Sequence, residues 1–266
     1  MEKYCLTAEE ILYLAAVAGA DTFYGIPDTL SGLSDQELRL KVAEMEDSLN
    51  VKEYLKEDFD GNRNIIPELM EMIRFCGNCE RLLCLEKAEI GEPQKAIIYF
   101  MSGNAAYKME CAKDQYLFSV TSHLEIRQET ERELAIKETE KKSVNDFLVS
   151  YEELEKAVTL AKRGSADKGI DILKAAGASD NIARAVVNGI LNRTNFYALL
   201  FMDFGDETDP GYSLQYISGD MPVVMEYEAE EDDQVKFLAV DGTELKERLE
   251  AGFKKVRCEE GEEIFS

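Results

Sequence analysis

The strongest constraint on the fold is an ordered series of matches between the two halves of the chain. Thr7 and Glu10 form a capping box at the start of an amphipathic stretch. The same box returns at an offset of 143. Further pairs follow in the same order at offsets of 116 to 119: Asn78 and Asn195, Leu82-Leu83 and Leu199-Leu200, Ser102-Gly103 and Ser218-Gly219, Met109-Glu110 and Met225-Glu226, Gln115 and Gln234, Phe118 and Phe237. The sequence therefore predicts an internal duplication.

In the first half, a period near 3.6 residues predicts helices, and a later period near two predicts strands. The expected helices cover 7–19, 34–48 and a stretch that begins at Pro67; the expected strands cover 81–89, 95–102, 105–113 and 115–121. Only short turns separate these strands, which is typical of an antiparallel meander. A short ribbon through the acidic turn at 58–62 is expected before the third helix.

The second half repeats this order after a charged connector at 127–146, in which we expect a strand at 133–138. Ser150 and Glu153 cap the next helix. The remaining expected helices cover 167–176, 180–192 and 242–253; the expected strands cover 196–204, 211–218, 222–229 and 234–240.

The fold class follows from what each half lacks. Helices followed by four antiparallel strands cannot bury both faces of a sheet alone, whereas two such halves can merge their strands. We therefore predict an internally duplicated α+β fold with a pseudo-twofold central antiparallel sheet flanked by two helical bundles. Residues 1–266 would form one domain built from the halves 1–126 and 147–255.

Charge excludes several classes of function. The chain has 30 Lys and Arg against 54 Asp and Glu, a net charge of −24, which disfavours binding to nucleic-acid phosphates or to anionic membrane surfaces. A winged helix-turn-helix interpretation of the first helices fails for the same reason, because acids outnumber bases over 34–62. No apolar run reaches the roughly twenty residues that span a bilayer, and no signal peptide opens the chain. We expect a cytoplasmic protein without membrane insertion.

The chain is poor in residues typical of catalysis. His123 is the single histidine and there is no tryptophan. One histidine cannot form a histidine-rich metal site, and it is the only candidate for the base of a catalytic triad. Phosphate-binding glycine loops and nucleophile elbows are also absent from the sequence. We expect His123 to be a surface or turn residue, and we predict no catalytic, cofactor-binding or metal-binding residues.

Cysteine provides the sharpest local motif, Cys76-Gly-Asn-Cys79, with Cys84 close behind. This motif suits half a zinc site or a redox pair, but no second pair completes a tetrahedron. Cys76 also falls on the apolar stripe of its helix, and a redox motif normally precedes a helix rather than ending one. We expect ordinary core or half-exposed thiols, with metal binding or redox chemistry as the alternative.

Two kinds of acidic segment have simple interpretations. Asp58-Phe-Asp-Gly-Asn62 resembles a calcium loop, but its glycine stands at the fourth position where an EF-hand needs it at the sixth. The acidic runs 228–233 and 259–263 are expected to be a solvated loop and tail.

Several segments resemble the EspG-like proteins of type VII secretion systems, in particular their Gram-positive relatives. They are TAEEILYLAAVAGADTFYGIPD, ELRLKVAEMEDSLNVKEYLKEDFDGNRNIIPELMEMI and the duplicated four-strand units. The resemblance implies a pseudo-twofold sheet with flanking bundles, in a cytosolic chaperone that covers the aggregation-prone tip of helical-hairpin dimers. It also implies substrate contacts through the C-terminal helical bundle and the loop between the second and third strands. In this chain that loop is only the tight turn Ser102-Gly103-Asn104, which we name as the candidate partner-binding residues.

The functional prediction is a non-enzymatic chaperone or adaptor that binds a helical secreted protein or heterodimer and needs no cofactor. One alternative is a structural homo-oligomer, such as a homodimer, that uses an exposed sheet face containing Ile97, Tyr99 and Met101. The other is an enzyme that works with carboxylates alone.

Overall fold

The computed structural model describes residues 3–20, 23–57, 63–88, 95–112, 114–134, 136, 146–192, 196–205, 211–218, 222–227 and 234–258. The chain divides into two compact units. Unit 1 contains residues 1–82, 97–123 and 204–207, and unit 2 contains residues 83–96, 124–203 and 208–266. Organisation as a single domain of two related halves stays a prediction.

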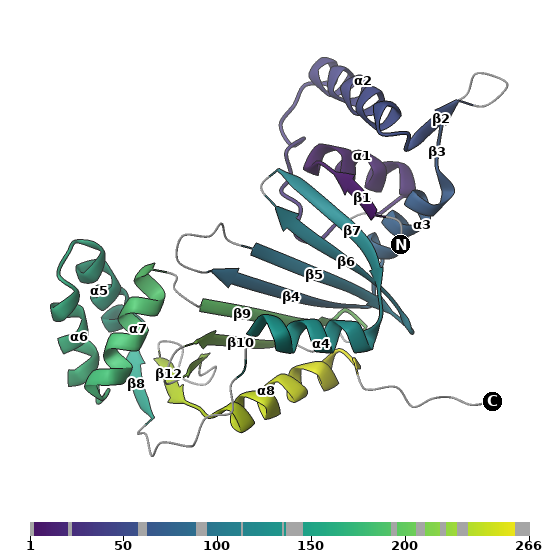
Figure 1. The fold of residues 1–266 in the computed structure, drawn as a ribbon. Helices are drawn as coiled ribbons and strands as arrows, with labels where there is room; N and C mark the ends of the chain where they lie inside the picture. The colour runs from purple at the N-terminus through teal and green to yellow at the C-terminus, as the bar shows by residue number, and fades with distance from the viewer. Residues whose placement is uncertain are drawn as a thin grey trace, which may run out of the picture. The chain divides into compact units, whose positions relative to one another are not determined.

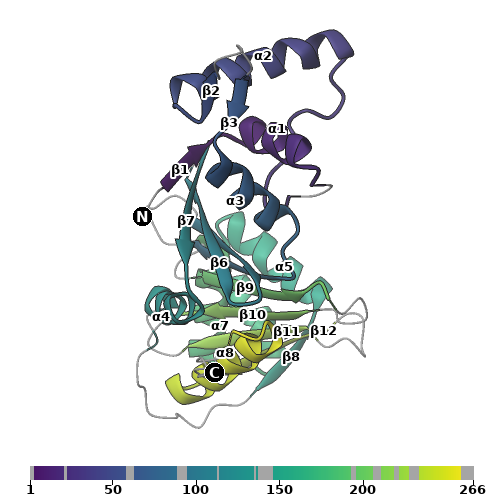
Figure 2. The same cartoon turned by 90° about the vertical axis from the view of Figure 1, so that its right-hand side faces the viewer.

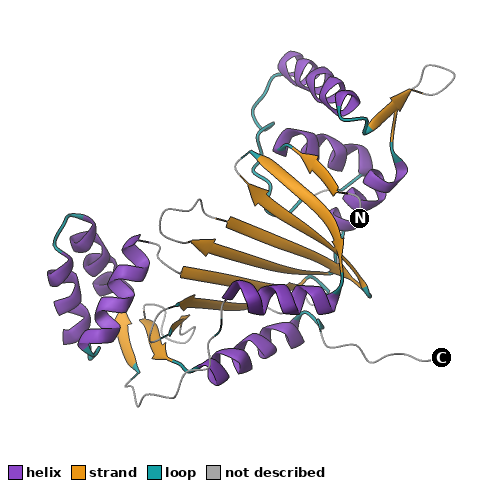
Figure 3. Ribbon diagram, in the orientation of Figure 1, coloured by secondary structure: helices purple, strands orange, loops and turns teal. Residues whose placement is uncertain are grey.

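Ten strands form one large antiparallel sheet (Figure 3). They are β1 (Lys3–Leu6), β4 (Arg81–Ala88), β5 (Lys95–Ser102), β6 (Ala105–Ala112), β7 (Gln115–Thr121), β8 (Phe147–Ser150), β9 (Phe196–Asp203), β10 (Tyr212–Ile217), β11 (Val223–Tyr227) and β12 (Gln234–Ala239). Their hydrogen-bonded order is β1-β7-β6-β5-β4-β9-β10-β11-β12-β8. A separate ribbon pairs β2 (Leu55–Glu57) with β3 (Arg63–Ile65). The α+β class and the large antiparallel sheet are confirmed.

Eight helices accompany these strands in the described residues. They are α1 (Ala8–Ala18), α2 (Asp35–Val51), α3 (Pro67–Gly77), α4 (His123–Leu134), α5 (Tyr151–Lys162), α6 (Ala166–Ala175), α7 (Asp180–Asn192) and α8 (Gly242–Lys255). Apart from the β2–β3 ribbon in the first half, the order of one strand, three helices, four strands and one helix occurs twice along the chain. Common origin of the two halves stays a prediction. None of the described helices combines the length and the apolar character needed to cross a membrane.

Helix boundaries follow from local capping. The predicted capping boxes at Thr7 and Ser150 are present, each with its glutamate three residues later. Two more boxes start α2 at Ser34 and α8 at Asp241. Gly19 ends α1 with φ 74°, a left-handed conformation that glycine adopts without penalty.

In unit 1, aromatic side chains join the start of the chain to the strands. The Phe23 ring lies 5.6 Å from the ring of Phe100 and 6.2 Å from that of Phe118. Helices α1 and α3 contact each other, as the rotated view in Figure 2 shows. The buried side of α3 carries Leu69, Met72, Ile73 and Cys76, whose spacing is that of one face of a helix.

In unit 2, helices α5, α6 and α7 pack side by side (Figure 1). Phe147 of β8 and Phe237 of β12 stack with ring centroids 5.1 Å apart inside the core that these helices cover. Gly169 allows α6 to approach α5 closely, because a Cβ atom there would lie 2.6 Å from the carbonyl oxygen of Ala157. Helix α8 contacts β9 and β10, and its Phe253 ring meets the Phe201 ring edge-on at 5.8 Å.

The expected connector requires a correction. Residues 127–134 continue helix α4, so the predicted strand at 133–138 is wrong at Glu133 and Leu134, while 135 and 137–145 lie outside the described residues. Ile126, Thr130 and Leu134 form a buried stripe with a period of four. The charged side chain of Arg127 is buried beside them. It donates to the Cys258 carbonyl oxygen at 3.1 Å, pairs with Glu250 and stacks on Phe253. These contacts, all with residues far away in the sequence, compensate for the loss of hydration of the buried charge.

The expected exposed sheet face is also corrected. Ile97, Tyr99 and Met101 are each at most 1 % exposed. Ile98 and Phe100, which alternate with them along β5, are buried as well. Because successive side chains point to opposite faces, β5 is covered on both sides. The homo-oligomer hypothesis therefore loses the surface on which it rested.

Candidate partner-binding site

The turn between β5 and β6 is the site singled out from the sequence. Ser102 ends β5, and Gly103 and Asn104 form an exposed turn that leads into Ala105. Gly103 has φ 55°, and a Cβ atom there would meet nothing within 4 Å. Glycine is therefore favoured by the left-handed backbone rather than by lack of space. The structure confirms a tight turn, and its role in binding stays a prediction.

Glu80 fastens this turn to the segment that precedes β4. Its backbone N–H donates to the Met101 carbonyl oxygen at 3.1 Å and to Ser102 Oγ at 3.0 Å. Its carboxylate in turn accepts the Gly103 N–H at 3.4 Å. The backbone and side chain of one residue thus hold both ends of the turn.

Arg81 adds a second restraint from beneath the turn. Only 6 % of this residue is exposed, and one guanidinium nitrogen donates to the Gly103 carbonyl oxygen at 3.2 Å. The same nitrogen lies 3.4 Å from Glu80 Oε2. Charge-assisted hydrogen bonds of this kind are stronger than neutral ones. The turn is consequently a preformed feature, in contrast to a long loop that becomes ordered only on binding.

Phe204 contributes an exposed aromatic residue to the same unit. Its backbone N–H donates to the Glu80 carbonyl oxygen at 2.7 Å, while the residue is 44 % exposed. Large exposed aromatic residues are enriched where proteins bind partners. The sequence predicts Phe204 at the end of a strand, and no sequence pattern indicates that this residue is exposed. Neither Glu80 nor Arg81 was identified, because their partners lie about twenty residues away in the chain.

His123 is the first residue of α4 and is half-buried. Burial lowers the pKa of its imidazole below the usual 6.5, and the positive charge of Arg81 lowers it further. The imidazole is accordingly neutral at pH 7. The expected surface or turn position is therefore corrected, because His123 begins a helix and is half-buried.

The Cys76-x-x-Cys79 motif ends α3. Cys76 is buried and Cys79 is half-buried. Burial raises the pKa of Cys76 well above its ordinary value and raises that of Cys79 to about 11. Metal ligation and nucleophilic attack both use the thiolate, so raised pKa values favour the interpretation as packing thiols.

Across the described ranges, no three His, Cys, Asp or Glu side chains gather as metal ligands. The calcium-like turn at 58–62 and the acidic runs at 228–233 and 259–263 lie outside those ranges.

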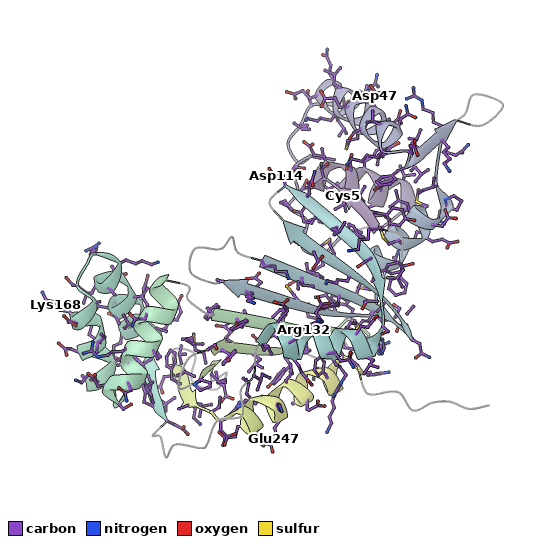
Figure 4. All side chains as sticks on the ribbon, viewed as in Figure 1. Cys5, Asp47, Asp114, Arg132, Lys168 and Glu247 are labelled. Atoms are coloured by element: carbon purple, nitrogen blue, oxygen red, sulfur yellow. The ribbon has the colours of Figure 1, made fainter. Side chains whose placement is uncertain are left out.

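Charged side chains cover the outer surfaces of the helices in both units. Asp47 on α2, Lys168 on α6 and Glu247 on α8 are exposed (Figure 4). Around the β5–β6 turn, the charged groups of Glu80 and Arg81 restrain the backbone of the turn. This region combines a polar turn, a buried arginine that restrains it and one exposed aromatic ring. This combination suits recognition of another protein.

Comparisons with known proteins bear on the fold. No protein-family model matches the chain, and no curated protein matches it in sequence. A solved structure does match: the Mycobacterium tuberculosis type VII secretion system chaperone EspG5 in complex with the PE25-PPE41 dimer. The TM-score is 0.60 with 10 % sequence identity, and the match covers 96 % of this chain and 96 % of that one. At this identity the likeness establishes an EspG-like fold.

Proposed function

We propose that this protein is a non-enzymatic, cytosolic chaperone or adaptor for helical-hairpin substrates of a type VII secretion system. The observation that supports it most is the extent of the structural likeness, which covers 96 % of both chains. The likeness therefore extends over nearly the whole chain and is not limited to part of the sheet. Fold alone does not define function, so the proposal also draws on the turn described above.

The partner-binding residues that we propose are Ser102, Gly103 and Asn104. The resemblance assigns substrate contacts to a loop at this position. Here Glu80 and Arg81 hold the turn in one conformation. A preformed contact loses little conformational entropy when the partner binds. We therefore infer that the helical partner meets a short rigid turn, and that its complementary surface is correspondingly small.

The two other hypotheses receive less support. A homo-oligomer through the face of Ile97, Tyr99 and Met101 is contradicted by the burial of all three residues. A carboxylate-only enzyme needs an acid with a raised pKa. Among the described carboxyl groups with a resolved shift, the pKa of Glu37, Glu133 and Asp180 is lowered by hydrogen bonds or ion pairs.

The test is co-expression with a helical-hairpin protein pair encoded beside this gene, followed by light scattering of the purified complex. We expect a stable complex with one copy of each chain. The variant Asn104→Arg should weaken binding at least tenfold, because a long charged side chain would stand at the proposed contact. Asn50→Arg, the same change on the exposed surface of α2, is the matched control and should bind normally.

Two results would count against the proposal in different ways. Absence of any complex would reject the chaperone function. A complex that tolerates Asn104→Arg as well as Asn50→Arg would keep the chaperone function and reject this turn as its contact.

A further inference from the structure

Among the described strands, none pairs with the outer edge of β8, the last strand of the sheet. Strand β8 pairs on one side with β12, with Phe147 opposite Phe237 and Val149 opposite Val235. The N–H of Val240 donates to the carbonyl oxygen of Pro222 at 3.0 Å, which fixes the phase of hydrogen bonding in β12. Since backbone groups alternate sides along a strand, even-numbered residues of β12 face β11 and odd-numbered ones face β8.

This phase determines where the backbone groups of Leu148 point. Phe147 and Val149 sit opposite odd-numbered residues of β12, so their N–H and C=O groups form the ladder. The N–H and C=O groups of Leu148 must point away from β12. Within the described parts of the chain, no hydrogen bond other than those of the sheet reaches Leu148. An edge residue with both backbone groups available is a template for another strand.

The opposite edge of the sheet is closed by side chains. In β1 the corresponding residue is Cys5, which follows Tyr4, opposite Phe118, as Leu148 follows Phe147, opposite Phe237. Its N–H donates to the hydroxyl of Tyr54 at 3.1 Å, and its carbonyl oxygen accepts from Lys52 Nζ at 3.1 Å. Two side chains thus occupy the groups that a further strand would use. In the part of the chain that the structure describes, no side chain occupies the equivalent groups of Leu148.

The side chains at the free edge define what would fit. Leu148 is 43 % exposed, so its apolar side chain could pack against an apolar residue of an added strand. Asp146, the residue before the first residue of β8, is also exposed. A strand partner that extends β8 by one residue would place Asp146 on the same face as Leu148. An added antiparallel strand would therefore need an apolar residue opposite Leu148 and a basic residue two positions later, opposite Asp146.

We propose that the outer edge of β8 is a strand-addition site for an extended, basic segment of another protein. Leu148 would supply the backbone hydrogen bonds and the apolar contact, and Asp146 would supply charge complementarity. The net charge of −24 also favours a basic occupant. This site is separate from the β5–β6 turn and does not depend on the chaperone proposal.

A second copy of this chain fits the edge poorly. Antiparallel pairing of two copies about Leu148 would place Asp146 opposite Ser150 of the other chain. That pairing would leave the Asp146 carboxylate of each chain without a basic residue opposite it. Two chains that each carry a charge of −24 would also repel each other.

The test uses the full chain and a labelled peptide, Thr-Val-Thr-Val-Thr-Lys-Thr-Lys, in a fluorescence anisotropy titration. A matched peptide carries Glu in place of both Lys. We expect saturable binding of the basic peptide and at least tenfold weaker binding of the acidic one.

Leu148→Pro should also weaken binding at least tenfold, because it removes the outward N–H. Proline is tolerated on an edge strand where that group faces solvent. Leu148→Lys serves as a second variant if the proline chain unfolds.

Hydrogen exchange at single amides gives an independent measurement. In the free protein the Leu148 amide should exchange quickly while those of Phe147 and Val149 are protected; the basic peptide should slow Leu148 specifically. Equal binding of the two peptides, full binding by both Leu148 variants or an already protected Leu148 amide would overturn the proposal. A concentration-dependent dimer whose formation protects that amide would identify a second copy as the occupant and equally reject a basic partner.

Discussion

The strand and helix that begin each half share the same local design but differ in their surroundings. Strand β1 leads into α1 through the capping box of Thr7 and Glu10, and β8 leads into α5 through that of Ser150 and Glu153. Tyr4 lies opposite Phe118 in β7, just as Phe147 lies opposite Phe237 in β12. The two capping boxes satisfy the same backbone N–H groups.

The difference lies in what covers each box. Only 1 % of Glu10 is exposed. Its carboxylate accepts hydrogen bonds from Ser48 Oγ at 2.7 Å and from Lys52 Nζ at 2.7 and 2.8 Å, both near the end of α2. Glu153 is exposed and serves the cap of its own helix. A local motif therefore fixes where a helix starts, while its energetic importance depends on whether another element packs over it.

The largest expected effect comes from removing the two capping glutamates in turn. Glu10→Ala should lower the free energy of unfolding by about 3 kcal/mol, because Lys52 loses its buried partner and α1 loses its cap. Glu153→Ala should cost only about 0.5 kcal/mol, the value of an exposed cap contact. Urea unfolding followed by circular dichroism measures both.

These two variants control for each other, since each deletes the same glutamate from the same kind of box. Similar losses of stability would show that burial by α2 adds nothing to the box of Glu10. The comparison between the halves would then fail at its main point.

A smaller effect is expected at the closed edge of the sheet. Tyr54→Phe removes the hydroxyl that accepts the Cys5 N–H but keeps the edge-to-face contact with Tyr4 at 5.5 Å. The loss of one hydrogen bond should cost about 1 kcal/mol. The Cys5 amide should exchange faster in this variant and approach the behaviour of Leu148. Tyr151→Phe, at an exposed position in the second half, should change neither quantity, and an unchanged Cys5 amide in Tyr54→Phe would contradict the assignment of Tyr54 as an edge cap.

Much of the secondary structure could be predicted because its signals are local. Capping residues, the stripe of α3 and the alternation of the strands placed most elements within a residue or two of their observed bounds. Helix α4 was missed because Arg127 and Thr130 interrupt its apolar stripe, and the partners that allow Arg127 to be buried lie more than 120 residues away. The duplication itself contained the missing information, since an offset of 119 aligns His123 with Gly242 at the start of α8.

The candidate site was predicted only in part, for a related physical reason. Ser102-Gly103-Asn104 is visible as a turn because glycine favours φ above zero. The restraints from Glu80 and Arg81 depend on strand pairing across the sheet. Short strands such as β1 and β8, with four residues each, carry too few alternations to be recognised. Whether the backbone groups of Cys5 and Leu148 point away from their neighbouring strands depends on the pairing register, which no sequence pattern encodes.

The smallest expected effect concerns the residues that start the final helix of each half. His123 begins α4 where Gly242 begins α8. Burial and the charge of Arg81 lower the pKa of His123 below 6.5. As pH falls below 6.5, the unfolded chain therefore takes up a proton before the folded protein does, and stability declines. Because the chain has one histidine, His123→Gln should flatten the dependence of the unfolding midpoint on pH between 7 and about 5.5. A variant that keeps the full slope would show that the decline arises from carboxylates, such as the ion-paired Glu133 of α4, and would remove the electrostatic link between His123 and the restrained β5–β6 turn.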